Sequence, residues 1–213
     1  MSGAVEILPA QRRTAVRWKN GGGVTREIAA FPPRAGLSDF DWRVSTAQIR
    51  SGGPFSVFPN IERILCVLEG ELTLCVQGHP AVRLSQHSVP FAFAGDAPAQ
   101  AEPHGGMVVD LNVMARRGRY IAAVKRVSAN TSLNLDADTT LIFALDEIRA
   151  SAAAMTFELS RLDAALVVGP ARCALSAAAA LAQCYLIEIR ARAPGLPGVH
   201  AATSSAPVPA SHR

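Results

Sequence analysis

The chain has 213 residues, of which 49% are apolar, so it can bury a substantial core as one large domain or two small ones. It has no apolar run near the length of a membrane-spanning helix and no basic-then-apolar leader, so we expect a cytoplasmic protein without a membrane partner. Its net charge of +4 is spread along the chain without a lysine tract, whereas nucleic-acid binders concentrate positive charge on one stripe, so we expect no nucleic-acid partner.

A glycine-rich segment stands near the start of the chain, with the sequence RWKNGGGVTREI over residues 17–28. Successive glycines let backbone amides approach another group closely. The segment lacks the GxxxxGKS/T form of a nucleotide-binding loop. With Lys19 and Asn20 before the glycines and Arg26 after them, it is either a donor-rich loop of a ligand site or a tight turn between two strands.

Alternation of polar and apolar residues predicts a strand over residues 41–49. Arg43 and Ser45 share one face of this strand, and Trp42 lies on the other. Either Arg43 and Ser45 face water, or they line a polar cavity while Trp42 packs outside. A second strand, over residues 108–114, allows the same two interpretations, and its shared face carries Asp110, Asn112 and Met114. From the sequence alone we favour the solvent-facing interpretation for both strands.

A hairpin is predicted over residues 63–77, with a tight turn at Glu69 and Gly70. Pairing across that turn places six residues on one face: Arg63, Leu65, Val67, Leu72, Leu74 and Val76. This face is almost wholly aliphatic and should line a barrel interior, so Arg63 should end an inward-pointing row. The opposite face can pack on a second barrel or on another subunit, as in a homodimer, through Ile64, Cys66 and Leu68.

Further short strands are predicted over residues 90–94, 141–145, 155–159, 165–168 and 185–190. Many short strands punctuated by turn residues are typical of a barrel or a sandwich. Residues 143–148 resemble residues 66–71, which indicates two related barrels, although two unrelated hairpins of similar composition would look the same. We therefore divide the chain into an N-terminal barrel with the pocket (1–125), a degenerate second barrel (126–192) and a disordered Ala/Pro/Ser-rich tail (193–213).

Two stretches, VLEG at residues 67–70 and VPFAFAG at residues 89–95, resemble the two-part signature of the cupin family. The resemblance places the family's metal-binding glutamate position at Arg63. It places the family's histidine positions at other residue types: Ser56 and Phe58, or Val57 and Pro59, and Pro98. A guanidinium repels a divalent cation, so we expect no metal site and no cofactor. If Arg63 is enclosed, it needs an anionic partner, either a neighbouring carboxylate or that of a ligand.

Five motifs together resemble the HutD/Ves family over residues 1–190: WKNGGGVTREI, FDWRVS, GPFSVFPNIER, PFAFAGD and DLNVMARR, in this order. The resemblance implies an all-β bicupin fold, with two jelly-roll-like antiparallel β-barrels of the cupin type and few or no helices. It also implies a link to histidine utilisation and a pocket for small carboxylates such as urocanate or N-formylglutamate. The sequence departs from the family at Asn60, where glycine is usual, and at Asp146-Glu147, which replace the second barrel's turn glycine.

Two hypotheses about function follow. In the first, which we favour, the protein binds a small carboxylate and senses or buffers a pathway intermediate, because guanidinium forks suit the charge and aromatic rings suit a flat body. Its candidate ligand-binding residues are Lys19, Asn20, Arg26, Arg43, Ser45, Arg63, Phe91, Phe93 and Asn112. In the second, the protein is a metal-independent isomerase, hydrolase or lyase, with acid–base groups drawn from Glu27, Asp110 and Lys19.

Overall fold

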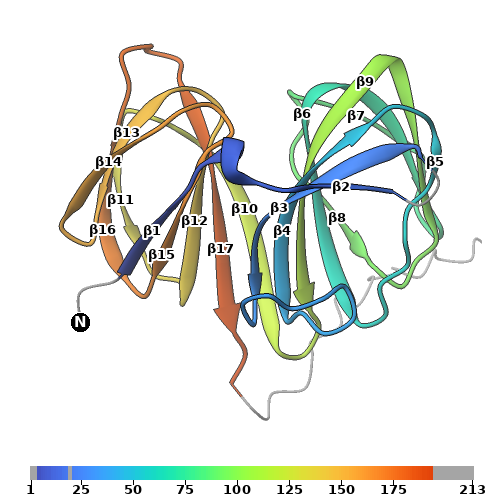
Figure 1. Ribbon diagram of the computed structural model, residues 1–213, viewed down its shortest axis with the longest axis horizontal. Coiled ribbons are helices and arrows are strands. Elements are labelled where there is room, and N and C mark those ends of the chain that lie inside the picture. The colour runs from blue at the N-terminus through green and yellow to red at the C-terminus, as the bar shows by residue number, and fades with distance from the viewer. Residues whose placement is uncertain (1–3, 19–20, 194–213) are drawn as a thin grey trace, which may run out of the picture.

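The computed structural model describes residues 4–18 and 21–193, which fold into two antiparallel β-barrels that lie side by side (Figure 1). Apart from one 3-10 turn, η1 (Ala10–Arg12), the regular structure of these residues is strand. The predicted all-β fold with few or no helices is therefore confirmed. No helix in these residues is long and apolar enough to cross a bilayer. The prediction of a disordered tail concerns residues that, beyond Ala193, lie outside the described ranges.

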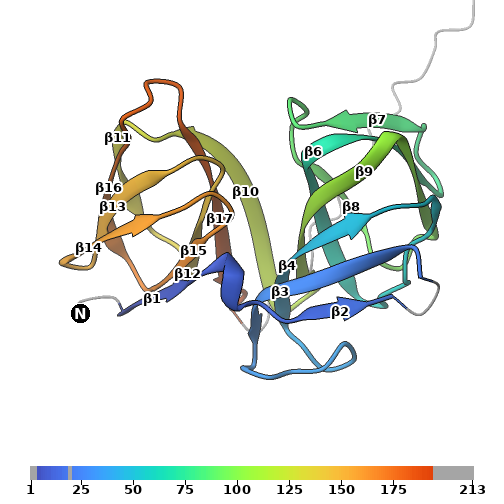
Figure 2. The same cartoon turned by 45° about the horizontal axis from the view of Figure 1, so that its top comes forward.

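The N-terminal barrel is one sheet with the strand order β2-β3-β4-β9-β6-β7, in which β5 pairs with β9 and β8 pairs with β6. Its strands are β2 (Ala15–Arg17), β3 (Gly23–Phe31), β4 (Trp42–Ile49), β5 (Gly53–Pro54), β6 (Ile61–Val76), β7 (Val82–Ser85), β8 (Phe91–Ala94) and β9 (Ala99–Arg116). The two long strands, β6 and β9, pair along most of their length, and the sheet curls round its own core (Figure 2). Leu65, Leu72 and Leu74 are fully buried in this core.

The C-terminal barrel has two sheets, with the orders β1-β15-β12-β17-β10 and β11-β16-β13-β14. Its strands are β1 (Ala4–Leu8), β10 (Tyr120–Ser128), β11 (Thr131–Leu135), β12 (Thr139–Ala144), β13 (Ile148–Ala152), β14 (Met155–Leu159), β15 (Ala164–Val168), β16 (Ala171–Ser176) and β17 (Gln183–Ala191). The core between the sheets is apolar. Of the described residues in this barrel, Thr140 is the only buried polar one, whereas the N-terminal half buries Asp41, Arg43, Ser45, Thr46, Arg63, Asp110 and Asn112. Buried polar and charged side chains are therefore concentrated in the N-terminal half.

The division of the chain between the barrels differs from the predicted one at both ends of the N-terminal half. Strand β1 pairs with β15 of the C-terminal barrel, from Ala4 opposite Val168 to Leu8 opposite Ala164. Strand β10 begins at Tyr120, before the predicted boundary at residue 125, and pairs with β17. From β1 in the C-terminal barrel, the chain thus crosses to the N-terminal barrel through η1 (Figure 1). When paired strands lie far apart in the sequence, the residues around each strand do not indicate which partner it will have.

The predicted hairpin at residues 63–77 is wrong, although the face assigned to each residue is right. Strand β6 continues through Gly70, and its pairing with β9 shifts register on either side of Glu69. Gly70 has a φ of +75°, and a Cβ there would lie 2.9 Å from the carbonyl oxygen of Met107, so this bulge requires glycine. A tight turn and a bulge both reverse the alternation of faces, so the predicted inward-facing row is buried: Arg63, Leu65, Val67, Leu72, Leu74 and Val76.

The barrels join through a continuous apolar interface. Cys66 and Leu68 of β6 belong to it, with Ile64 at its margin, so the apolar row predicted for this strand packs on the second barrel of the same chain. Phe143 and Tyr185 contribute fully buried rings from the C-terminal side. At the edge, Arg126 donates to the hydroxyl oxygen of Tyr185 and to the carbonyl oxygen of Gln86, both at 2.5 Å. These contacts fix one barrel against the other.

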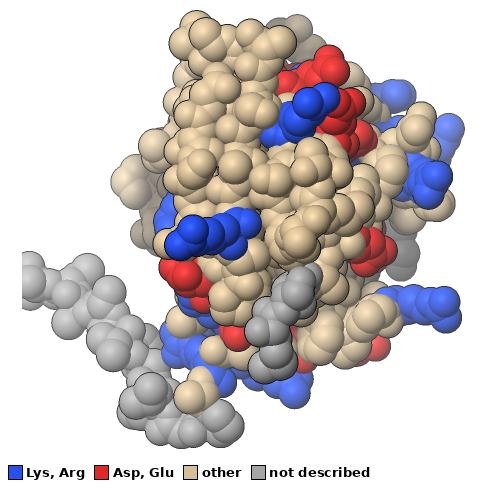
Figure 3. All heavy atoms as spheres, turned by 90° about the vertical axis from the view of Figure 1, so that its left-hand side faces the viewer, with Lys and Arg blue, Asp and Glu red and all other residues tan. Residues whose placement is uncertain are grey.

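The outer face of the C-terminal barrel is mostly uncharged, and its basic side chains form small separate groups (Figure 3). Elsewhere in this barrel, basic side chains are neutralised by acidic neighbours, as in the pairs of Arg149 with Glu158 at 2.7 Å and of Lys125 with Glu188 at 3.1 Å. The outer face of the C-terminal barrel therefore lacks the continuous basic stripe on which nucleic-acid binders rely.

Candidate functional site

Polar side chains from neighbouring strands meet inside the N-terminal barrel as cross-strand rows. Residues that are paired across adjacent strands point to the same face of a sheet. From β4 across β9 and β6 to β8, two of these rows are Ser45–Asn112–Leu65–Phe91 and Arg43–Met114–Arg63–Phe93. An adjacent row is Ala47–Asp110–Val67. Because Leu65 and Val67 belong to the barrel core, the polar members of all three rows face the interior.

The solvent-facing interpretation of these strands is therefore wrong. Arg43 and Ser45 are only 8% and 3% exposed, and Trp42 packs outside the barrel, in the interface with the C-terminal half. Asp110 and Asn112 are buried in the same way. Alternation of residues identifies which side chains share a face, but it does not say what covers that face. Here the curl of the sheet and the neighbouring barrel cover both faces.

Arg63 stands at the end of the inward-facing row of β6 and is 4% exposed. Its guanidinium carbon is 4.9 Å from the ring centre of Phe93, 5.0 Å from that of Phe55 and 5.7 Å from that of Phe58. Its Nη1 donates to the carbonyl oxygen of Ser56 at 3.3 Å, but its Nε has no hydrogen-bond partner among the described residues. Burial lowers the pKa of Arg63 to about 10, so the group remains charged at neutral pH. Aromatic faces stabilise this cation but cannot accept all of its hydrogen bonds.

Asp110 is an acidic residue whose charge acts on Arg63 and raises the pKa of the guanidinium, against the effect of burial. Burial raises the pKa of Asp110 to about 7, while the charge of Arg63 and a hydrogen bond from the Ala47 backbone act in the opposite direction. Neither Oδ1 of Asp110 nor Oδ1 of Asn112 has a hydrogen-bond partner in the described part of the chain. An Asp whose pKa is near 7 is charged only in part at neutral pH, so it compensates Arg63 incompletely.

Arg43 is paired differently, with an acidic residue at the margin of the interior. Its Nε donates to Oε2 of Glu27 at 2.7 Å, and its Nη1 donates to Oγ of Ser45 at 3.3 Å. Glu27 reaches Arg43 because it is paired with Ser45 just before a bulge in β3. The Glu27 side chain is 42% exposed, whereas that of Arg43 is 10% exposed. The pair thus spans the boundary between the barrel interior and its outer surface.

Not all of the predicted ligand-binding residues come together in this interior. The structure assembles Arg43, Ser45, Arg63, Phe93 and Asn112, and Phe91 packs beside Phe93 with ring centres 6.1 Å apart. Arg26 is paired with Thr46, so it points to the opposite face of the sheet and does not join them. Lys19 and Asn20 lie outside the described residues.

Three aromatic residues that the sequence analysis did not select shape the site. Phe55 and Phe58 lie in the segment between β5 and β6 and cover Arg63. Trp18 contacts Phe55 edge to face, with ring centres 6.5 Å apart, and its Nε1 donates to Oγ1 of Thr25 at 2.8 Å. A Cβ on Gly23 would lie 3.0 Å from the Trp18 ring and 2.6 Å from a backbone oxygen, so the last of the three glycines is needed for close packing. The two phenylalanines in GPFSVFPN were the available sequence signal.

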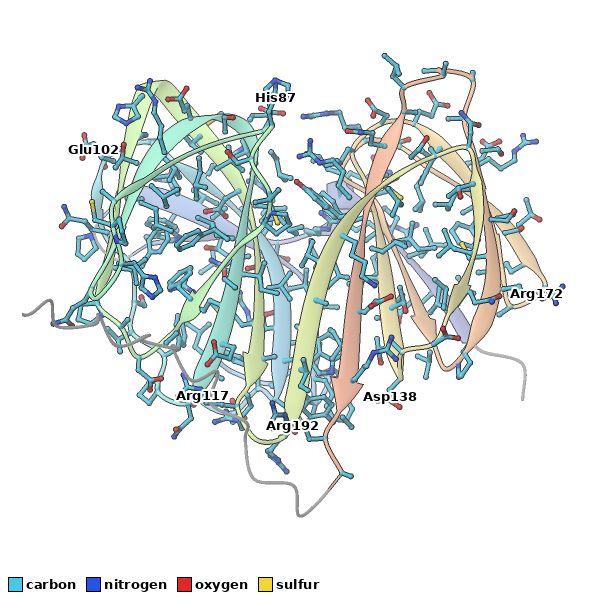
Figure 4. The ribbon with its side chains drawn as sticks, turned by 180° about the vertical axis from the view of Figure 1, so that it is seen from behind. His87, Glu102, Arg117, Asp138, Arg172 and Arg192 are labelled. Carbon is cyan, nitrogen blue, oxygen red and sulfur yellow. The ribbon has the colours of Figure 1, made fainter. Side chains whose placement is uncertain are left out.

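The residues inside this barrel do not fit the metal centre of the metal-dependent cupins. Arg63 occupies the interior where a cation would need ligands, and no group of three His, Cys, Asp or Glu residues is suitably placed in the described ranges. His87 is exposed at the top of the N-terminal barrel, on the side toward the C-terminal barrel (Figure 4), and His79 is also exposed. His104 is in contact with Thr73, with Nε2 2.7 Å from Oγ1.

Elemental analysis of the purified protein is therefore expected to find no stoichiometric zinc, iron, manganese or nickel. The physical reason is the repulsion between a divalent cation and the Arg63 guanidinium. One metal ion per chain that is lost when His79, His87 or His104 is replaced would contradict this expectation.

Comparisons with known proteins identify the family. The family model described as HutD matches residues 10–185. The chain belongs to the HutD family. An uncharacterized 21.2 kDa protein in the hutC 3′ region of Pseudomonas putida is 36% identical over 141 residues, covering 66% of this chain and 73% of that relative. Protein Ves of Cronobacter sakazakii is 40% identical over 123 residues, covering 57% of this chain and 66% of that relative, so the match spans just under two thirds of Protein Ves.

Solved structures of this HutD family member's relatives show the same fold. HutD from Pseudomonas fluorescens SBW25, determined in a formate condition, has a TM-score of 0.76 and 28% identity, with coverage of 89% of this chain and 100% of that one. A conserved protein of unknown function from Pseudomonas aeruginosa PAO1 has a TM-score of 0.80 and 29% identity, with coverage of 88% and 99%. A cupin 2 conserved barrel domain protein from Leptotrichia buccalis, at 10% identity and a TM-score of 0.53, supports the cupin fold alone.

Proposed function

We propose that the interior of the N-terminal barrel binds a small organic carboxylate. The observation that carries this proposal is the buried Arg63 guanidinium, whose Nε has no hydrogen-bond partner among the described residues. A charged group that is buried without full compensation is costly, and a ligand carboxylate would supply both the charge and the hydrogen-bond acceptors that Asp110 supplies only in part. Phe93 and Phe55 provide flat apolar walls beside it.

The family indicates which carboxylates to test. A relative from Pseudomonas putida is named for its position in the hutC 3′ region, and the family is named HutD. We therefore propose a role in histidine utilisation, with urocanate or N-formylglutamate as the ligand. Sensing or buffering a pathway intermediate requires a binding site only, and the interior offers charge, hydrogen-bonding groups and aromatic walls for that purpose.

Titration calorimetry of the full-length protein with urocanate and with N-formylglutamate tests this function. We expect saturable binding of one ligand per chain for at least one of the two acids. Glycerol, a small polar molecule without a carboxylate, is a negative control. If neither acid produces a saturable signal at millimolar concentration, carboxylate binding by this interior is ruled out for the pathway proposed.

A second candidate function is supported by one specific observation, the pKa of Asp110. A buried carboxyl group with a pKa of about 7 is suited to general acid–base catalysis at neutral pH. Turnover of either acid that disappears in Asp110→Asn or Glu27→Gln would support a metal-independent enzyme. Binding without any product after prolonged incubation would leave the binding function alone.

A further inference from the structure

An open cavity lies at one end of the N-terminal barrel, next to the cross-strand row that contains Arg63. It encloses about 550 Å³ between the loop that joins β3 to β4 and the segment that joins β5 to β6. Figures 1 and 2 both show the loop from β3 to β4 at the lower end of the barrel. The lining of the cavity comes chiefly from Leu37, Phe40, Val57, Phe58, Ile61 and Arg116. A volume of this size is in the range of small-molecule sites.

The cavity and the position of Arg63 are consecutive levels of the same barrel. Ile61 lines the cavity, and Arg63 follows two residues later on the same face of β6, roughly 7 Å further along the strand. Met114, which is paired with Arg63, packs in one apolar cluster with Phe40 and Ile61. The residues that line the cavity are therefore in contact with the row that holds the guanidinium.

Because Arg63 is almost fully buried, part of its surroundings must move before a ligand can reach the guanidinium. Three rings lie against that guanidinium. Phe93 is itself buried in β8, and Phe55 packs against the barrel core and the ring of Trp18. Phe58 is half-buried and also lines the cavity, so its ring is the one of the three that borders an open space into which it can turn.

The backbone that carries Phe58 is held in place, so the movement we consider is a rotation of the ring. The backbone amide of Phe58 donates to the carbonyl oxygen of Gly95 at 2.8 Å, and that of Asn60 donates to Oδ1 of Asp96 at 2.8 Å. A Cβ on Gly95 would lie 2.8 Å from the carbonyl oxygen of Phe58, so the two segments are in close contact. Pro59 also restricts the backbone of the residue before it to extended conformations. Rotation of a partly exposed side chain is a faster and smaller motion than opening a strand.

We infer that this cavity is the vestibule through which the ligand enters the barrel, and that the ring of Phe58 is the gate between the vestibule and Arg63. The inference rests on the proposed function, because it takes Arg63 as the group that binds the ligand. In the closed position the ring centre lies 5.7 Å from the guanidinium carbon. In the open position the ring turns into the vestibule, towards Phe40, with which it is already in edge-to-face contact at 6.0 Å. The charged residue in the described lining of the vestibule is Arg116, so an entering anion is not repelled there.

The rate at which a small anionic reagent enters the barrel tests the gate without any ligand. Ser45 is 3% exposed and lies one row beyond Arg63 as seen from the vestibule, so Ser45→Cys places a reporter thiol in the interior. The exposed Cys75 is replaced by serine in the same full-length protein, and the remaining cysteines are buried. The reagent is 2-sulfonatoethyl methanethiosulfonate, and mass spectrometry follows the modification. The protein with Cys75→Ser alone supplies the background rate.

Phe58→Ala should speed modification of the reporter thiol at least about tenfold, because an open state that is populated at a tenth or less becomes permanent. Phe58→Leu keeps more of the apolar volume and should speed modification about two- to fivefold, which preserves the test if the alanine variant does not fold. Leu37 is 62% exposed beside the vestibule, and Leu37→Trp should slow modification at least about twofold because a larger ring narrows the entrance.

The matched control is Phe31→Ala. Phe31 is also a partly exposed phenylalanine, 40% exposed, but it stacks on Trp42 on the outer face of the sheet. Its replacement should leave the rate of modification within about twofold of the wild-type rate, because it is remote from the interior. Thermal melting checks that each variant is folded.

The outcomes separate this inference from the proposed function. If Phe58→Ala and Phe58→Leu leave the rate of modification unchanged, the gate is wrong. The vestibule is wrong if Leu37→Trp does not slow modification, or if Phe31→Ala speeds it as much as Phe58→Ala does. Faster modification in the Phe58 variants, together with no binding of urocanate or N-formylglutamate by calorimetry, would support the gate and overturn the proposed function alone.

Discussion

Arg63→Met is expected to weaken the binding of urocanate or N-formylglutamate by roughly 10- to 150-fold. The substitution removes charge-assisted hydrogen bonding worth about 1.5–3 kcal/mol in total. Arg63→Lys should recover only part of the affinity, because an ammonium cannot reproduce the two parallel hydrogen bonds of a guanidinium. Titration calorimetry on the wild type and the two variants measures the effect.

The fold should survive this substitution. Arg63 is packed among the rings of Phe55, Phe58 and Phe93, and methionine follows the path of its aliphatic stem and makes favourable contacts with aromatic rings. The variant also removes a charge that is buried at a cost. Thermal melting should therefore show a midpoint close to that of the wild type. Unchanged ligand affinity would mean that Arg63 serves only as a structural partner for Asp110, and the carboxylate site would have to lie elsewhere.

The second large effect is the dependence of ligand affinity on pH. N-formylglutamate should bind with nearly constant affinity between about pH 5 and pH 6, where its own carboxyl groups are ionised, and lose up to about tenfold in affinity for each pH unit above pH 7. The reason is Asp110, whose pKa burial raises to about 7: above that pH its carboxylate competes with the ligand for Arg63 and repels it. The pKa of Arg63, about 10, keeps the guanidinium charged across the range. The other two charged residues near this interior, Arg43 and Glu27, are paired with each other.

Asp110→Asn is the variant that isolates this effect. Between pH 6 and pH 9 its affinity for N-formylglutamate should be nearly constant, and calorimetry in buffers of matched ionic strength measures it. The free energy of unfolding also decreases as the pH rises. Because the pKa of Asp110 is raised on folding, its contribution to stability is fully present below pH 4 and is lost as the pH rises through about 7. A wild-type affinity that does not change between pH 6 and pH 9 would show that Asp110 does not interact with the ligand.

Strand β6 shows how a wrong prediction of local structure can still assign the correct residues to the inward face. The sequence around Glu69 and Gly70 predicted a tight turn, and the structure has a bulge in a continuous strand. Both features reverse which residues face inward, so Arg63 was assigned correctly to the interior. The choice between turn and bulge depends on His104 and Val109 of β9, which lie more than thirty residues later in the chain and pair on either side of Gly70.

The sequence by itself determined the all-β fold, the family and the sets of residues that share a strand face, because strand alternation and motif order are local properties of the chain. Only the tertiary structure decided that Arg43 and Asp110 are buried and that Arg26 points away from them. It also brought Glu27 to Arg43 and placed β1 in the C-terminal barrel. Burial, and with it the raised pKa of Asp110, depends on which strands cover a face, and those strands are distant in sequence.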